Sequence, residues 1–243
     1  MTDISFEFFP PKTITAAFSL QRAAQTLSMF APHFGSVTCS HNPTQTLDTL
    51  AALDKLALGP FQAHITCASQ HNNQLPQYLR AAKRAGAKGI VALRGDGKSQ
   101  GLTVCQLIQA AQKQEYNQVF VAAYPEVHPM AQNAQSDLDM LLRKQDAGAS
   151  AAITQFFFDA DHFLKFRDQA AAHGITMPLI PGILPVQNWP KTQSMTQACG
   201  TSVAPDLAEG FERAAREGRS ELMAIAHATE LCDKLIQNGV GQL

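Results

Sequence analysis

The sequence has few charged residues and almost no excess of either sign. Lys, Arg, Asp and Glu make up 16% of its 243 residues, and the net charge is -1. Binding to a phosphate backbone requires a basic surface, so we expect no nucleic-acid partner. No run reaches the roughly 18 apolar residues of a membrane helix, and the N-terminal residues lack a basic segment followed by an apolar one. We therefore expect a cytoplasmic protein without a membrane partner.

Cysteine is also scarce, and its pattern excludes two kinds of cross-link. The count is odd and no C-x-x-C pair occurs, so neither a disulfide framework nor a zinc knuckle is indicated. The five residues are Cys39, Cys67, Cys105, Cys199 and Cys232. His128, Glu126 and His64 together suggest a metal, but they lack the close spacing of zinc ligands, and we expect no metal site.

Phosphate-binding motifs are missing as well. The chain contains no G-x-G-x-x-G, no G-x-x-x-x-G-K-[ST] and no long Gly-rich loop, which argues against a Rossmann domain or a P-loop. A pyrophosphate could still bind to Arg94, Arg143 and Lys144. Arg143 and Lys144 stand late in an expected helix, however, where positive charge is favourable without any ligand.

What the chain does contain is a regular alternation of short apolar runs and helical patterns, which is typical of parallel strands joined by crossover helices. The expected strands are Ile4–Phe8, Phe34–Thr38, Gln62–Thr66, Gly89–Leu93, Gln118–Ala123, Ala151–Gln155 and Met177–Ile180. The expected helices are Thr15–Phe30, Thr46–Leu58, Leu75–Ala85, Thr103–Gln114, Ser136–Ala147, Ala160–His173, Gln193–Gly200, Pro205–Glu217 and Ser220–Gln237. No linker interrupts them, so residues 1–243 are predicted to form one domain.

The predicted fold is an α/β (β/α)8 TIM barrel that lacks its last strand-helix unit. Seven strand units are expected, and Gly239–Leu243 stands where an eighth strand would begin. A barrel of about 250 residues is ordinary in length. An open barrel and a barrel closed by a partner are the alternatives to C-terminal truncation, which we favour because Val240 and Leu243 resemble the lead-in to a strand.

Polar residues stand at the ends of six expected strands, where a parallel barrel builds its site. Gln155 ends one strand, and Asp159 follows as the expected N-cap of the next helix. A solvated loop amide is the alternative interpretation of Gln155. The other strand-end groups are Glu7, Thr38, His64, Thr66, Arg94-Gly95-Asp96, and Tyr124 with Glu126 and His128.

Glu7 alternates with Phe6 and Phe8 on a strand that we expect to be largely buried. Burial raises a carboxyl pKa and suits the group to act as a general acid, although a structural Glu paired with Arg or Lys is the alternative. Gly95 would let backbone N–H groups approach an anion or a flat ring. Tyr124 offers a flat face to a ring, and a core tyrosine is the alternative.

Six segments give the chain a specific resemblance. In order and spacing, it resembles the bacterial, flavin-dependent methylenetetrahydrofolate reductases over nearly its whole length. The segments are Ser5-Phe-Glu-Phe-Phe-Pro-Pro-Lys12, Ile90-Val-Ala-Leu-Arg-Gly-Asp96, Val121-Ala-Ala-Tyr-Pro-Glu-Val-His-Pro129, Lys144-Gln-Asp-Ala-Gly-Ala149, Ile153-Thr-Gln-Phe-Phe-Phe-Asp159 and Ile180-Pro-Gly-Ile-Leu-Pro-Val186.

The resemblance implies an oxidoreductase that carries FAD, takes hydride from NADH or NADPH, and converts 5,10-methylenetetrahydrofolate to 5-methyltetrahydrofolate. This reaction belongs to one-carbon metabolism and methionine supply, and we expect a homo-oligomer. By motif, Glu7 resembles the general acid, Asp96 the carboxylate beside flavin and pterin, and Gln155 the folate-binding amide; all three are expected to contact the substrate. The residues at FAD-contacting positions are Thr38, His64, Arg94, Gly95, Asp96, Tyr124, His128, Asp137, Arg143 and Lys144.

The chain departs from the family pattern mainly around the cofactor. The turn Cys39–Pro43 is short, no tyrosine stands near Thr103, and Met195 replaces a phenylalanine that stacks on nicotinamide or folate. Met is a poorer stacking surface than an aromatic ring. Two alternatives therefore remain open: a flavin-free relative that transfers hydride directly, and a catalytically silent folate-binding barrel.

Overall fold

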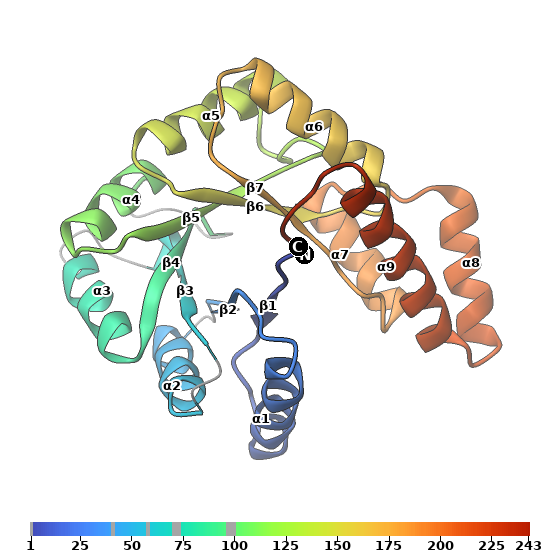
Figure 1. Ribbon diagram of the computed structural model, residues 1–243, viewed down its shortest axis with the longest axis horizontal. Helices are drawn as coiled ribbons and strands as arrows, with labels where there is room; N and C mark the ends of the chain where they lie inside the picture. The colour runs from blue at the N-terminus through green and yellow to red at the C-terminus, as the bar shows by residue number, and fades with distance from the viewer. Residues whose placement is uncertain (1, 40–41, 57–58, 70–73, 96–100) are drawn as a thin grey trace. The chain divides into compact units, whose positions relative to one another are not determined.

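A computed structural model describes residues 2–39, 42–56, 59–69, 74–95 and 101–243. Asp96, Leu58 and part of the Cys39–Pro43 turn, which the sequence singled out, lie outside these residues. The described strands are β1 Ser5–Phe8, β2 Phe34–Val37, β3 Phe61–Thr66, β4 Ala87–Leu93, β5 Gln118–Ala123, β6 Ala151–Phe156 and β7 Leu179–Gly182 (Figure 1). The described helices are α1 Ile14–Ser28, α2 Pro43–Asp54, α3 Leu75–Arg84, α4 Val104–Lys113, α5 Ala134–Asp146, α6 Ala160–Ala172, α7 Trp189–Cys199, α8 Pro205–Arg216 and α9 Ser220–Gln237, with a 3-10 turn η1 at Cys67–Ser69.

The strands form one sheet in sequence order from β1 to β7. Pairing between β1 and β2, and onward to β5, is parallel, with Glu7 opposite Ser36 and His64 opposite Val91. Parallel neighbours in chain order, each joined by a helix, are the pattern of a (β/α) barrel. The described residues provide seven of its strands, and an eighth unit is not confirmed.

The chain divides into two compact units. The larger unit contains Asp3–Ala122 and Arg143–Ala152, and the smaller one contains Met1–Thr2, Ala123–Leu142 and Ile153–Leu243. In the larger unit, Phe34 and Phe120 pack with ring centroids 5.0 Å apart, and Val37, Ala63, Ile65 and Ile90 have no exposed surface. Strands buried on both faces explain why these runs are continuously apolar rather than alternating.

Two apolar clusters hold the smaller unit together. One joins the segment just after β6 to α6 and α9 through Phe157, Phe163, Leu231, Leu235 and Val240. The other joins Phe156 and Phe158 to α7 and α8 through Trp189 and Phe211, whose rings stack at 5.1 Å. Val240 and Leu243, interpreted above as a lead-in to a strand, pack on the first of these clusters.

Most element boundaries agree with the sequence to within a few residues, and the exceptions have local causes. Asp159 accepts a hydrogen bond from the Asp161 N–H, which confirms it as the N-cap of α6. The expected start of α7 at Gln193 was wrong: the helix begins at Trp189, because the Asn188 side chain caps the Lys191 N–H and Pro190 suits the first turn. Strand β7 extends to Gly182, whose N–H donates to Thr154 Oγ1 at 3.0 Å.

Candidate functional site

In the larger unit, Glu7 and His64 meet from two different strands. Glu7 lies in β1 and His64 in β3, and Glu7 Oε2 stands 3.5 Å from His64 Nε2. The His64 side chain is 8% exposed, whereas the Glu7 side chain is 47% exposed. The expectation of a buried Glu7 was therefore wrong. Phe8 is the buried residue of β1, because successive side chains of a strand point to opposite faces.

Burial makes His64 a neutral neighbour for Glu7. It lowers the pKa of His64 from 6.5 to about 4, so the imidazole is uncharged at neutral pH and the contact is not a salt bridge. Within the described residues, His64 Nε2 is buried without a hydrogen-bond partner. Partial burial also raises the pKa of Glu7, because it removes part of the water that stabilises the charged carboxylate.

The low pKa of His64 predicts a loss of stability in mild acid. In the unfolded chain the imidazole binds a proton as pH falls through about 6.5, but in the folded protein it binds that proton only as pH falls through about 4. The contribution of His64 is thus fully present above pH 6.5 and is lost as pH falls toward 4. Between pH 7 and 4.5 we expect this residue to lower the free energy of unfolding by about 2 to 3 kcal/mol.

Urea unfolding of the wild type and of His64→Gln at both pH values measures this contribution. The amide cannot titrate, so the variant should lose less stability on acidification. Glu7, whose raised pKa has the opposite effect on stability, is present in both proteins. Equal losses in the two proteins would show that burial does not suppress protonation of His64.

The backbone of Arg94 and Gly95 packs closely against the end of β3. The Arg94 carbonyl accepts from the Ala68 N–H at 3.1 Å, and Gly95 has a φ of +80°. A Cβ at Gly95 would stand 2.9 Å from the Cβ of Thr66. Both conformation and space therefore require glycine here. The Arg94 side chain is exposed just after β4. Thr38 extends the pairing of β2 with β1, because its N–H donates to the Phe8 carbonyl at 2.9 Å.

The two cations of α5 behave differently. Lys144 Nζ donates a hydrogen bond of 2.7 Å to the carbonyl of Ala122, near the end of β5. The Arg143 side chain is exposed. Lys144 is thus held against the end of β5, and both residues fit the alternative of favourable charge at a helix C-terminus. The larger unit therefore contains seven of the predicted site residues: Glu7, Thr38, His64, Arg94, Gly95, Arg143 and Lys144.

In the smaller unit, three predicted residues form one cluster after β5. The rings of Tyr124 and His128 meet edge to face with centroids 4.4 Å apart. Asp137 Oδ2 accepts from the His128 N–H at 2.8 Å, and His128 Nδ1 accepts from the Met130 N–H at 2.9 Å. Asp137 therefore orders the backbone of this segment. Gln155 is half-buried at the end of β6, and its Oε1 accepts from the Phe156 N–H at 3.0 Å.

Comparison with known sequences identifies the family. The sequence model described as methylenetetrahydrofolate reductase matches residues 1–243. The chain belongs to the methylenetetrahydrofolate reductase family. It is 39% identical over 201 residues to 5,10-methylenetetrahydrofolate reductase of Pectobacterium carotovorum, covering 79% of this chain and 66% of that protein. The Escherichia coli enzyme of the same name is 37% identical over 219 residues, covering 86% and 73%. The chain thus spans about two thirds to three quarters of these relatives.

Solved structures support the fold alone. A Clostridium thermocellum protein described as binding two copies of 5-methyl-5,6,7,8-tetrahydrofolic acid matches with a TM-score of 0.63 at 13% identity, covering 99% of this chain and 86% of that one. Phosphonopyruvate hydrolase matches with a TM-score of 0.56 at 16% identity, covering 98% and 92%. Such low identity carries no information about substrate.

The sequence did not predict the structural contacts of Glu126. It was considered only as a metal ligand with His128 and His64, but its carboxylate contacts Ser202 and His162. The described residues contain no group of three or more His, Cys, Asp or Glu that could hold a metal ion. Its position in the motif Tyr124-Pro-Glu-Val-His128 marks Glu126 as a candidate functional residue, but its contact partners are too far away in the sequence to be predicted.

None of the described helices is long and apolar enough to cross a membrane.

Proposed function

We propose that this protein reduces 5,10-methylenetetrahydrofolate to 5-methyltetrahydrofolate, with FAD as cofactor and NADH or NADPH as hydride donor. Membership in the methylenetetrahydrofolate reductase family supports the reaction. The single structural observation that carries the proposal is the Glu7–His64 pair, a carboxyl group with a raised pKa beside a buried neutral imidazole. We further propose that residues 1–243 act as one barrel domain in a cytoplasmic homo-oligomer.

The described residues suit a flavin in each unit taken separately. In the larger unit, His64 Nε2 is a buried polar atom without a hydrogen bond among the described residues, the Gly95 backbone has no room for a side chain, and Arg94 and Lys144 provide positive charge. In the smaller unit, Tyr124 and His128 offer ring surfaces. Bound FAD would supply hydride transfer from the nicotinamide to the folate. The residues that would hold it are Thr38, His64, Arg94, Gly95, Asp96, Tyr124, His128, Asp137, Arg143 and Lys144.

The role of Glu7 follows from the chemistry of the folate. Opening the five-membered ring of methylenetetrahydrofolate needs a proton donor to the nitrogen that leaves. A carboxyl group with a raised pKa keeps its proton closer to neutral pH. A positively charged neighbour would lower that pKa and remove the proton, so the neutral state of His64 preserves Glu7 as an acid.

Two further residues complete the proposal. Asp96 would stabilise the cationic iminium form of the folate that accepts hydride, because a carboxylate aimed at developing positive charge lowers the barrier. Asp96 lies outside the described residues, and its role rests on the motif Arg94-Gly-Asp96. Gln155 would bind the folate with its amide, exchanging the local bond to the Phe156 N–H for a bond to substrate.

An absorbance spectrum of the purified protein tests the cofactor assignment. We expect a flavin band, and its bleaching on anaerobic addition of NADH or NADPH. A colourless protein that still oxidises NADH with methylenetetrahydrofolate would replace this proposal with direct hydride transfer. Folate binding without any turnover, after addition of FAD, would instead indicate a silent folate-binding barrel.

A further inference from the structure

Glu126 joins two loops of the smaller unit that lie far apart in the sequence. It stands in the segment between β5 and α5, and its side chain is 16% exposed. Glu126 Oε2 accepts from the Ser202 N–H at 2.9 Å and from the Ser202 hydroxyl, while His162 Nδ1 lies 3.3 Å from the same oxygen. Hydrogen bonds to a carboxylate are shorter and stronger than those between neutral groups. One carboxylate oxygen therefore holds the loop after α7 and faces the first turn of α6.

The loop after α7 has two more contacts with neighbouring segments. The Thr201 hydroxyl donates to the Phe156 carbonyl at 3.2 Å, directly after Gln155 at the end of β6. Gly200, with a φ of +70°, packs on Pro129, and a Cβ there would stand 3.1 Å from Pro129 Cγ. The segment Tyr124–Pro129 and the end of β6 are thus both anchored to residues 200–202.

The backbone beside Glu126 is strained. Val127 has a φ of +71°, a conformation that a β-branched residue adopts only when its surroundings impose it. On its C-terminal side, the His128 N–H is held by Asp137 at 2.8 Å. On the N-terminal side of Val127, the Glu126 side chain fixes the backbone through its hydrogen bond from the Ser202 N–H. Losing the Glu126 contacts should therefore let this turn relax and move the rings of Tyr124 and His128.

We propose that Glu126 is a positioning residue that sets Tyr124 and His128 for flavin binding by fixing their loop to residues 200–202. This inference rests on the proposed function, because Tyr124 and His128 matter only if a flavin binds there. Glu126 itself need not touch the cofactor. Within the described residues its second oxygen, Oε1, is buried without a partner, so Oε2 carries the protein contacts that are described.

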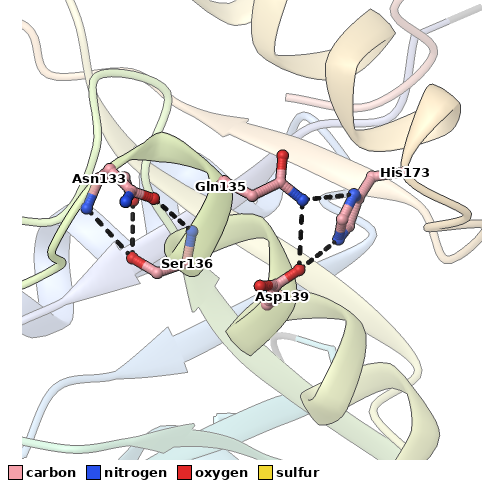
Figure 2. A network of polar contacts seen from close by, with 5 residues as sticks. All are labelled: Asn133, Gln135, Ser136, Asp139 and His173. Atoms are coloured by element: carbon pink, nitrogen blue, oxygen red, sulfur yellow. Dashed lines mark hydrogen bonds and ion pairs between the residues drawn. The ribbon is translucent and has the colours of Figure 1, made fainter.

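A second carboxylate–histidine pair in the same unit provides a matched control. Asp139 in α5 contacts His173 Nε2 at 2.8 Å, and Gln135 bridges the two residues; Figure 2 shows this network beside the Asn133–Ser136 cap of α5. His173 follows the last turn of α6, whereas His162 lies in its first turn. Eleven residues of helix separate them by about 16 Å. Asp139→Asn thus weakens a similar pair at the opposite end of α6 from the Glu126 contact.

The experiment compares the wild type, Glu126→Ala, Glu126→Gln and Asp139→Asn by two measurements. The first is the FAD dissociation constant, from quenching of flavin fluorescence. The second is amide hydrogen exchange in peptides that cover residues 124–131 and 200–203, which needs no flavin. In Glu126→Ala we expect faster exchange in both segments and FAD binding weakened roughly tenfold, because a loop that is competent a tenth of the time lowers affinity by that factor. Glu126→Gln keeps an acceptor and should show a smaller effect, and Asp139→Asn should change neither measurement.

Each outcome decides a different point. Faster exchange without a change in FAD affinity would show that Glu126 is only structural and overturn the inference. Unchanged exchange, or the same loss of affinity in Asp139→Asn, would also overturn it. A wild type that binds no FAD would refute the flavin assignment and the inference with it. The FAD titration of the wild type alone distinguishes this outcome from the others. Should Glu126→Ala fail to fold, Glu126→Gln and Ser202→Ala provide the same comparison.

Discussion

Glu7→Gln is expected to lower the rate of folate reduction by on the order of 10² to 10⁴, because it removes the proton donor for ring opening. Oxidation of NADH by an artificial electron acceptor should continue largely unchanged, since that half-reaction needs no proton for the folate. The amide has nearly the same size as the carboxyl group, and Glu7 is 47% exposed, so the fold should tolerate it. Rapid-mixing measurements of the two half-reactions separate the two effects.

A matched control for Glu7→Gln is Glu217→Gln. Glu217 is similarly exposed at 50%, and its carboxylate lies 3.7 Å from Arg219. This second substitution removes a comparable surface carboxylate from the end of α8, and both half-reactions should proceed at wild-type rates. If Glu7→Gln slows both half-reactions equally, Glu7 supports structure or cofactor binding, and its assignment as general acid is wrong.

Phe163→Ala is expected to destabilise the protein by about 3 to 5 kcal/mol, the usual effect of truncating a buried aromatic side chain. Phe163 is 1% exposed and stacks on Phe157 with ring centroids 5.7 Å apart. Its cluster joins Phe157, which stands two residues after Gln155, to α6 and α9. The free energy of unfolding in urea measures the effect, and the folate affinity of the remaining folded protein should also fall.

The corresponding control is Phe18→Ala in α1. Phe18 is 64% exposed, so its truncation should change stability by only about 0.5 kcal/mol. A loss in Phe163→Ala no larger than that in Phe18→Ala would mean that the cluster of Phe157, Phe163 and Leu235 does not support the smaller unit.

The elements were predictable because their signals are local. Parallel strands buried on both faces appear as continuous apolar runs, and helix starts are marked by side-chain caps such as Thr103, whose reciprocal bonds with Gln106 the structure shows. The seven expected strands are all present, displaced by at most two residues at either end. The start of α7 was missed because Pro190 is as typical of a turn as of a first helical turn, and the Asn188 cap that decides between them is seen only in the structure.

The candidate site was only partly predictable, since its contacts depend on residues distant in the sequence. The motifs placed Glu7 and His64 at strand ends, but neither their 3.5 Å contact nor the exposure of Glu7 could be deduced from alternation alone. Met195 packs against the cluster of Trp189 and Phe211, which a single-residue comparison could not show. The role of Glu126 was hidden because Ser202 follows it by 76 residues.

The central claim is tested most directly by measuring 5-methyltetrahydrofolate itself. Purified protein supplemented with FAD would be incubated anaerobically with NADH or NADPH and methylenetetrahydrofolate, and the product quantified by mass spectrometry beside Glu7→Gln. We predict one molecule of 5-methyltetrahydrofolate for each nicotinamide oxidised in the wild type and almost none in the variant. No product from a folded wild type that has bound both FAD and folate would contradict the proposed reaction.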